Sequence, residues 1–281
     1  MMDFSYQIAQ TAHQSLIREV RTTPKPGLVD QNNTGAHKDM DLPLFLKSAD
    51  SLFPYFQKCA QTGILHQHRP DDLLTFLRPL GIHAEEEMYQ ATNHVNTHKG
   101  AIFSMGIFCA AAGYLHQHGQ EKDSVHYFSD FSDTCSKICS HLLEDFKHIT
   151  VSSPCTNGEQ LYILHKITGI RGEAALGFPS VFQIGFPTYK NYCKEGLSSL
   201  DAGACTLLHL IAHVEDTNII SRSSYETYLA IRQALSFYLK TAFAAEILSV
   251  LPEMDQIFIS RNISPGGCAD LLALIYFLDL L

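Results

Sequence analysis

Polar side chains that could bind an anionic ligand gather just before one predicted helix. The stretch ATNHVNTHKGAIFSMG, residues 91–106, places Asn96, His98 and Lys99 directly ahead of small and apolar residues. A solvated loop would explain the polar residues, but not the glycine, alanine and serine that follow them. At the start of a helix, bare backbone N–H groups and the helix dipole attract phosphate. The stretch therefore indicates either a wet loop or one wall of a ligand site.

A carboxylate precedes this stretch on a mostly apolar helix face. Glu85, Met88 and Thr92 follow one another at spacings that place them on the same face of a helix. A carboxylate in such surroundings needs a partner, a metal ion or a catalytic role. Glu85 is therefore a candidate site residue, and a salt-bridged structural glutamate is the alternative.

Two later segments repeat the pattern of charged residues at a helix junction. GIRGEAALGFP, residues 169–179, carries Arg171 and Glu173 between glycines. VEDTNIISR, residues 214–222, carries Glu215, Asp216 and Arg222. Magnesium prefers oxygen ligands and often uses one or two carboxylates together with phosphate, so Glu215 and Asp216 are candidate Mg²⁺ ligands. Arg222 could hold a phosphate with its guanidinium.

A long polar loop follows the first predicted helix. TPKPGLVDQNNTGAHKDMD, residues 23–41, contains Lys25, Asp30, His37 and Asp39. Loops of this length are uncommon inside a compact domain unless they have a function. The alternative to a functional loop is a surface loop that only caps the neighbouring helices. SPGGCAD, residues 264–270, could bind an anion at another helix start, or be a plain cap. No Walker or dinucleotide-binding glycine motif occurs in the sequence.

The elements that must position these residues follow a helical period almost throughout, which predicts an all-α fold. We expect one multi-helix bundle domain of roughly ten helices, spanning residues 1–281. Helices are predicted over residues 4–21, 42 to about 61, about 70–91, about 98–117, 124–148, 197–213 and 224–248, and a last one begins with Ser264 as N-cap and Pro265 in first position. Asp41 and a Thr156–Glu159 capping box mark two further starts. Residues 177–187, GFPSVFQIGFP, are expected to be non-helical.

The composition of the chain limits which partners it can bind and in which cellular compartment it is expected. The net charge of −9 argues against a nucleic-acid partner, and the longest apolar run, LLALIYFL, is too short to span a bilayer. No signal peptide is visible. The eight cysteines form no C-x-x-C pair, and a helix junction is expected between His94 and His98, so neither set indicates a metal site. Scattered single cysteines fit small core residues of a cytoplasmic protein.

The polar motifs together resemble the triphosphoribosyl-dephospho-coenzyme A synthase family. TPKPGLVD, GAHKDMD, VNTHKGAIFSMG, RGEA followed by GFP, DTNI and SPGG followed by ADLLAL occur in family order over nearly the whole chain. The resemblance implies an all-α transferase that joins ATP to 3′-dephospho-CoA and releases adenine. It further implies that the product is the precursor of the prosthetic group on the acyl carrier protein of citrate lyase or malonate decarboxylase.

The chemistry of that reaction and the positions of the motifs suggest residue roles. Cations should bind the phosphates, Mg²⁺ should accompany the triphosphate, and a carboxylate should assist at the sugar. We expect phosphate binding by Lys25, Lys99, Arg171 and Arg222, Mg²⁺ ligation by Glu85 and Asp216, base or sugar-stabilising roles for Asp39, Glu85 or Glu173, and substrate contacts from Asp30, His37, Asn96, His98 and Asn218.

Three departures from the family pattern bear on activity. Gln31 stands where the family usually has arginine, and Ser223 and Ser224 replace two glycines after Arg222. The glycine expected after the Ala–Thr pair is replaced by Asn93 and His94. Loss of glycine could change how closely the backbone approaches a phosphate.

Two other functions fit the same residues. His37, Asp39 and Asp216 could belong to an all-α, Mg²⁺-dependent nucleotide phosphohydrolase. A non-catalytic nucleotide-binding homologue is the third reading. The sequence leaves the oligomeric state open, a homo-oligomer included.

Replacing Glu85 by glutamine tests its predicted metal role. The change removes the charge but keeps the size, so adenine release should fall and should need more Mg²⁺. The measurement is adenine release over a Mg²⁺ series for wild type and Glu85→Gln. Unchanged activity with unchanged Mg²⁺ dependence would exclude the role.

Overall fold

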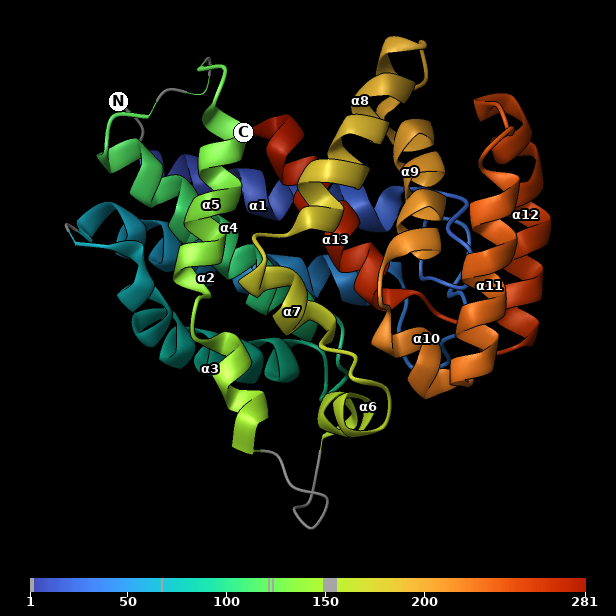
Figure 1. Cartoon of the computed structure of the whole chain (residues 1–281), viewed down its shortest axis with the longest axis horizontal. Coiled ribbons are helices and arrows are strands. Elements are labelled where there is room, and N and C mark those ends of the chain that lie inside the picture. The colour runs from blue at the N-terminus through green and yellow to red at the C-terminus, as the bar shows by residue number, and fades with distance from the viewer. Residues whose placement is uncertain (1–2, 67, 121, 123, 149–155) are drawn as a thin grey trace.

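The computed structural model describes residues 3–66, 68–120, 122, 124–148 and 156–281. Within these ranges the chain folds into α-helices without a strand, which confirms the all-α prediction (Figure 1). The thirteen α-helices of the described ranges are α1 (Phe4–Arg21), α2 (Leu42–Leu65), α3 (Leu73–Ala91), α4 (Lys99–Gln117), α5 (Tyr127–Ile138), α6 (Asn157–His165), α7 (Gly169–Ala175), α8 (Phe186–Lys194), α9 (Ser199–His213), α10 (Thr217–Arg222), α11 (Tyr225–Tyr238), α12 (Ala244–Ser260) and α13 (Gly266–Leu280).

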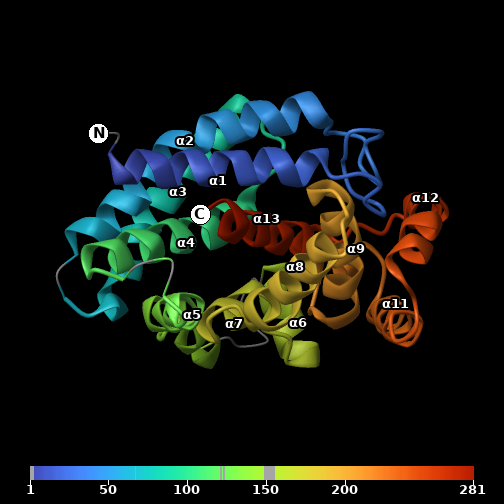
Figure 2. The same cartoon turned by 90° about the horizontal axis from the view of Figure 1, so that it is seen from above.

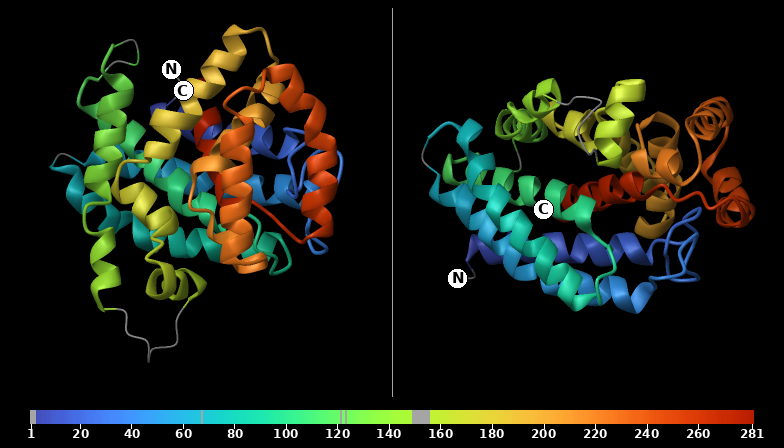
Figure 3. Two further views of the ribbon diagram at one scale, coloured as in Figure 1. Left: turned by 45° about the vertical axis from the view of Figure 1, so that its right-hand side comes forward. Right: turned by 90° about the horizontal axis from the view of Figure 1, so that it is seen from below.

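Helix α13 lies at the centre of the molecule. It lies with α4 between a layer formed by α1 and α2 and a second group that includes α7, α8 and α9 (Figure 2). Helices α11 and α12 pack at one end, next to α9 (Figure 3). The eight consecutive residues of α13 from Leu271 to Leu278 are all buried, which is typical of a helix that is covered on every side.

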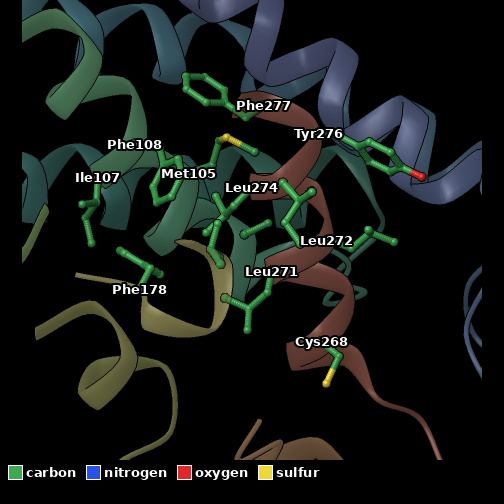
Figure 4. Packing of buried hydrophobic residues seen from close by; sticks show 14 of the residues in the cluster. Met105, Ile107, Phe108, Phe178, Cys268, Leu271, Leu272, Leu274, Tyr276 and Phe277 are labelled. Carbon is green, nitrogen blue, oxygen red and sulfur yellow. The ribbon is translucent and has the colours of Figure 1, made fainter. Parts of the chain in front are cut away.

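The core around α13 is built from interlocking aromatic rings. Phe108 of α4 lies 5.1 Å from Phe131, 5.1 Å from Phe178 and 5.9 Å from Phe277, measured between ring centroids (Figure 4). The hydroxyl of Tyr276 lies 2.6 Å from that of Thr22, just after α1. These contacts tie α13 to the end of the first helix and to helices from the middle of the chain.

Glycines allow α2 and α4 to cross at close range. A Cβ on Gly63 would lie 2.0 Å from the carbonyl oxygen of Ala110, and one on Gly113 would lie 2.2 Å from that of Ala60. Only hydrogen fits at these positions, so the two backbones meet directly. This crossing lies in the C-terminal half of α4 and fixes the position of that helix against α2.

Local signals predicted several helix boundaries correctly. Helix α1 has the predicted bounds, and the carboxylate of Asp41 accepts a hydrogen bond from the backbone N–H of Leu44 at the start of α2. The Thr156–Glu159 capping box is present at the start of α6. Among the described cysteines, Cys193 is half-buried and the others are buried, while Cys155 lies outside the described residues. No helix in these ranges has both the length and the apolarity needed to cross a bilayer.

Four of the predicted elements were wrong in part. The predicted helix 124–148 is α5 followed by a separate 3-10 helix, Leu142–His148, and the predicted helix 224–248 is two helices, α11 and α12. Residues 180–185 form a π-helix that leads into α8. Pro179 is the N-cap of the π-helix and Pro187 lies in the first turn of α8, where a missing N–H is tolerated. At the last helix the N-cap is Pro265, since the Ser264 hydroxyl contacts the His37 Nε2 atom at 2.8 Å.

The glycine crossing should be intolerant of a single methyl group. Gly113→Ala is expected to destabilise the protein by about 1–3 kcal/mol through overpacking, measured as the free energy of unfolding in urea. Gly158→Ala is the matched control, because a Cβ there meets nothing within 4 Å and alanine favours the helix. Equal stability of the two variants would contradict the proposed backbone contact.

Candidate active site

A cavity of about 730 Å³ opens where the loop after α1 meets the starts of α4, α7, α10 and α13. Its size lies in the range of small-molecule and cofactor sites. The cavity brings together most of the predicted site residues, from segments far apart in the sequence: Lys25, His37, Asp39, Asn96, His98, Lys99, Glu173, Asn218 and Arg222. The other four, Asp30, Glu85, Arg171 and Asp216, are not among the residues that line it.

The loop after α1 is fixed by Asp30. Its Oδ2 accepts hydrogen bonds from the Lys25 backbone N–H, at 3.0 Å, and from the Thr23 hydroxyl, at 2.7 Å. Its Oδ1 accepts the backbone N–H groups of Asn32 and Asn33. Asp30 therefore shapes the loop that positions Lys25, which is a supporting role beside the cavity.

Lys25 is buried and is paired with a residue that the sequence motifs did not identify. Its side chain is only 1% exposed, and its ammonium forms an ion pair with Glu19 of α1, which is 5% exposed. Burial raises the pKa of Glu19, and the Lys25 charge opposes that shift. The carboxylate thus neutralises the predicted phosphate-binding cation.

Asp270 is a second carboxylate that was not among the predicted site residues, although it ends the SPGGCAD motif. It lines the cavity from α13, and a Cβ on Gly100 would lie 2.0 Å from its Oδ2 atom. The carboxylate therefore rests against the first turn of α4. Burial, with smaller contributions from Glu19 and Asp216, raises the pKa of Asp270 well above its ordinary value.

His98 lies in the same part of the cavity and is neutral. Burial lowers the pKa of His98 to about 3, and Lys25 contributes to this shift. Its Nδ1 atom lies 2.7 Å from the Ser48 hydroxyl oxygen. Its Nε2 atom is buried and has no hydrogen-bond partner among the described residues. We call Glu19, Lys25, His98 and Asp270 the inner cluster.

Two other predicted phosphate-binding cations, Lys99 and Arg222, lie nearer the outside of the cavity than the inner cluster. Lys99 has a 53% exposed side chain and forms a 2.9 Å ion pair with Glu85, and this hydrogen bond raises the pKa of Lys99. Arg222 donates through Nη2 to the Ala36 carbonyl, at 2.6 Å, and to the Asn262 side chain, at 2.7 Å. Both cations are held by protein groups at the cavity wall.

His37 faces Arg222 across this outer part of the cavity. Burial lowers the pKa of His37, and the charge of Arg222 lowers it further. The imidazole contacts the hydroxyl of Ser264, at 2.8 Å. Nearby Asp39 is exposed and lines the cavity, so it is open to solvent and to a ligand.

Glu173 and Asp216 both accept backbone hydrogen bonds. Glu173 lines the cavity and accepts the Ser180 backbone N–H at 2.6 Å, and burial raises its pKa. Asp216 caps α10 with Oδ1 and accepts the Cys268 backbone N–H with Oδ2 at 2.8 Å. Burial raises the pKa of Asp216, and these backbone bonds oppose the shift.

The guanidinium of Arg171 lies over the Phe146 ring, at 5.5 Å.

The departures from the family pattern are accommodated locally. Asn93 and His94 adopt positive φ angles of 53° and 66°, a conformation that glycine adopts most freely but that asparagine tolerates. Ser224 caps α11 by accepting the backbone N–H of Thr227, at 3.1 Å. Gln31 is exposed. Within the described ranges, no group of three or more His, Cys, Asp or Glu side chains has the arrangement of a metal site.

The fold and the cavity define an all-helical protein with a deep polar site between its helices. The chain belongs to the family of ATP:dephospho-CoA triphosphoribosyl transferases, whose sequence model matches residues 5–281. It is an enzyme of this kind, and the resemblance seen in the motifs is confirmed.

Curated relatives support the same assignment. The chain is 41% identical to a probable 2-(5′′-triphosphoribosyl)-3′-dephosphocoenzyme-A synthase of Photobacterium profundum, over 96% of this chain and 86% of the relative. It is 40% identical to the synthase of Haemophilus ducreyi, over 99% of this chain and 90% of the relative. It is 37% identical to the probable synthase of Streptococcus mutans, over 96% and 95%. No solved structure matches the chain significantly.

Removing one partner of the buried ion pair should be costly. Lys25→Met leaves the Glu19 charge buried and unpaired, so we expect a loss of about 3–5 kcal/mol in the free energy of unfolding. The double variant Glu19→Gln/Lys25→Met should recover most of it. Lys99→Met is the control and should change stability by about 1 kcal/mol or less, because its pair with Glu85 is at the surface.

The same variant should show a specific pH dependence. A carboxylate whose pKa is raised in the folded state stabilises the fold at low pH and loses that contribution as pH rises through the folded pKa. Without Lys25 nothing opposes the raised Glu19 pKa, so the deficit of Lys25→Met relative to wild type should be smaller at about pH 5 than at about pH 8. A deficit that is equal at both values would show that Glu19 is not the cause.

Proposed function

We propose that the chain transfers the triphosphoribosyl group of ATP to a ribose hydroxyl of 3′-dephospho-CoA and releases adenine. The description of its family names ATP and dephospho-CoA as the substrates. The observation that supports the proposal most directly is the cavity itself. It gathers cations, amides and carboxylates from five separate segments in a space large enough for a nucleotide.

The proposed reaction is a substitution at the C1′ carbon of ATP. The glycosidic C1′–N9 bond breaks, and adenine leaves with the electron pair. The attacking hydroxyl oxygen forms the new bond to C1′, and its proton balances the charge on the departing base. Such centres pass through an oxocarbenium-like state, which a nearby carboxylate stabilises. A base that receives the hydroxyl proton typically contributes about 10²–10⁴-fold.

The arrangement supports a division of these tasks. Lys99 and Arg222 are suited to the triphosphate, since both lie at the outer wall of the cavity. Asp39 is exposed at that wall, whereas Glu173 is engaged by Ser180, so Asp39 is the better candidate for the base. Asn96 and Asn218 are exposed amides that line the cavity and could orient ribose or phosphate.

Magnesium is proposed as the companion of the triphosphate, whose charge it would neutralise. Glu85 is held by Lys99, and both Asp216 oxygens accept backbone N–H groups, so these two predicted ligands would act best through water. Glu215 is exposed at the cavity and suits direct ligation better. One direct carboxylate with phosphate oxygens is a common arrangement for Mg²⁺.

The wider setting follows from the family resemblance. We infer that the product is passed on towards the acyl carrier protein of citrate lyase or malonate decarboxylase, and that the reaction takes place in the cytoplasm. A homo-oligomeric state remains a prediction.

The decisive assay is the release of adenine. Incubation with ATP and Mg²⁺ should release adenine only when 3′-dephospho-CoA is added, with one coupled nucleotide product formed per adenine. Chromatography of both products is the measurement. Phosphate release without the acceptor would instead support a phosphohydrolase, and binding without turnover a non-catalytic homologue.

A further inference from the structure

The inner cluster differs in charge from the outer wall of the cavity. The ammonium of Lys25 is paired with Glu19, and Asp270 adds a second carboxylate, so the cluster carries no unpaired cation. Outside it, Lys99 and Arg222 provide positive charge. A phosphate group would meet no unpaired cation in the inner cluster, whereas the outer cations attract it. The part of a substrate that fits the inner cluster is therefore uncharged.

The hydrogen bonds around His98 favour one position for its ring proton. The Thr97 hydroxyl donates to the Ser48 oxygen, at 2.7 Å. The single proton of Ser48 is then free for the His98 Nδ1 atom, 2.7 Å away. A neutral imidazole that accepts at Nδ1 carries its hydrogen at Nε2. Because the pKa of His98 is lowered to about 3, the ring stays neutral at physiological pH.

The Nε2–H group of His98 is therefore a donor without an acceptor. His98 is 3% exposed, and no described residue accepts a hydrogen bond from its Nε2 atom. A buried donor left unpaired costs about 1–3 kcal/mol, and such groups in native structures call for an explanation. Since His98 also lines the cavity, a ligand that brings an acceptor to this nitrogen would recover that free energy.

The surroundings of the cluster are apolar. Leu16 lies one helical turn before Glu19, Leu271 follows Asp270, and both line the cavity together with Leu28. The Phe45 ring meets the His98 ring edge-on, at 4.9 Å between centroids. A flat ligand group with two apolar faces and a polar edge fits such a space better than a sugar, whose hydroxyl groups surround the ring.

We propose that the inner cluster binds the adenine base of one of the two substrates, with His98 Nε2–H donating to ring nitrogen N7 and Asp270 accepting from the neighbouring amino group. The adjacent acceptor and donor of adenine match the donor and acceptor of the protein. Asp270 can accept in either protonation state through its carbonyl oxygen. The proposal rests on the proposed function, since both substrates of that reaction contain adenine.

Binding measurements with 7-deaza analogues test the proposal and identify the substrate. These analogues replace N7 by a carbon and so remove the acceptor. We expect calorimetry on wild type to show about tenfold weaker binding for either 7-deaza-ATP or 7-deaza-dephospho-CoA than for the natural compound. A loss in the first arm assigns the cluster to ATP, and a loss in the second assigns it to dephospho-CoA.

Variants of His98 show whether this residue is the donor. In His98→Ala the natural compound and its 7-deaza analogue should bind equally, because the donor is gone. His98→Gln is the matched control, since its side-chain amide can place an N–H near the position of Nε2 and should retain the discrimination. Thermal unfolding of both variants shows that they are folded.

Inosine triphosphate, or the inosine form of dephospho-CoA, tests Asp270. The O6 atom of the inosine compounds is an acceptor, which wild type rejects when Asp270 is ionised, whereas Asp270→Asn can rotate its amide to donate. The comparison is therefore made at alkaline pH, where ionisation of Asp270 is favoured. The preference for the adenine form over the inosine form should therefore fall about tenfold or more in Asp270→Asn.

The outcomes separate the two proposals. Wild type that binds both 7-deaza analogues as tightly as the natural compounds overturns the inference, as does discrimination that persists in His98→Ala. These results would leave the proposed function intact if adenine release still depends on the acceptor. Absence of adenine release from natural substrates would instead contradict the proposed function.

Discussion

The carboxylate of Asp216 joins two helix starts on which much of the cavity depends. One oxygen accepts the backbone N–H groups of Asn218 and Ile219 in α10, and the other accepts that of Cys268 in α13. The residue is 1% exposed, so these bonds are shielded from water and its loss would leave buried donors unpaired. A Cβ on Gly267 would lie 3.1 Å from the same carboxylate, so the glycine leaves room for this contact. Through this one side chain, the polar groups of α10 and α13 face a common space.

The cavity explains how an acidic protein can bind polyanionic substrates. The net charge of −9 gives no general attraction for phosphate, so binding depends on a few cations in fixed positions. Lys99 and Arg222 are held in place by protein groups, while Lys25 is already neutralised by Glu19. The cavity therefore has an outer region suited to charge and an inner region suited to an uncharged base. This separation gives a nucleotide only one favourable orientation.

Sequence reasoning succeeded where the signals were local. Helical periodicity and side-chain caps predicted α1 and the start of α2, but the break between α11 and α12 contains neither proline nor glycine and gave no signal. The polar motifs identified most of the cavity lining. They did not assign a role to Glu19, which looks like one of several charged residues at the end of α1, or to Asp270 at the end of the SPGGCAD motif, because only tertiary packing brings the two together. The proton position on His98 likewise depends on Ser48, which is 50 residues away in the sequence.

The contact between the first and last helices has a consequence for protein synthesis. Arg18 of α1 forms a 3.0 Å ion pair with Asp279 of α13, 261 residues later, and the guanidinium also lies 5.3 Å from the centre of the Tyr276 ring. Helix α13, at the centre of the core, is thus translated after the twelve other α-helices of the described ranges. Until then, the apolar surfaces that pack against α13 are exposed. Long-range contacts of this kind slow folding and favour aggregation of incomplete chains. On the ribosome, neither the core nor the inner part of the active site can close until α13 has left the exit tunnel.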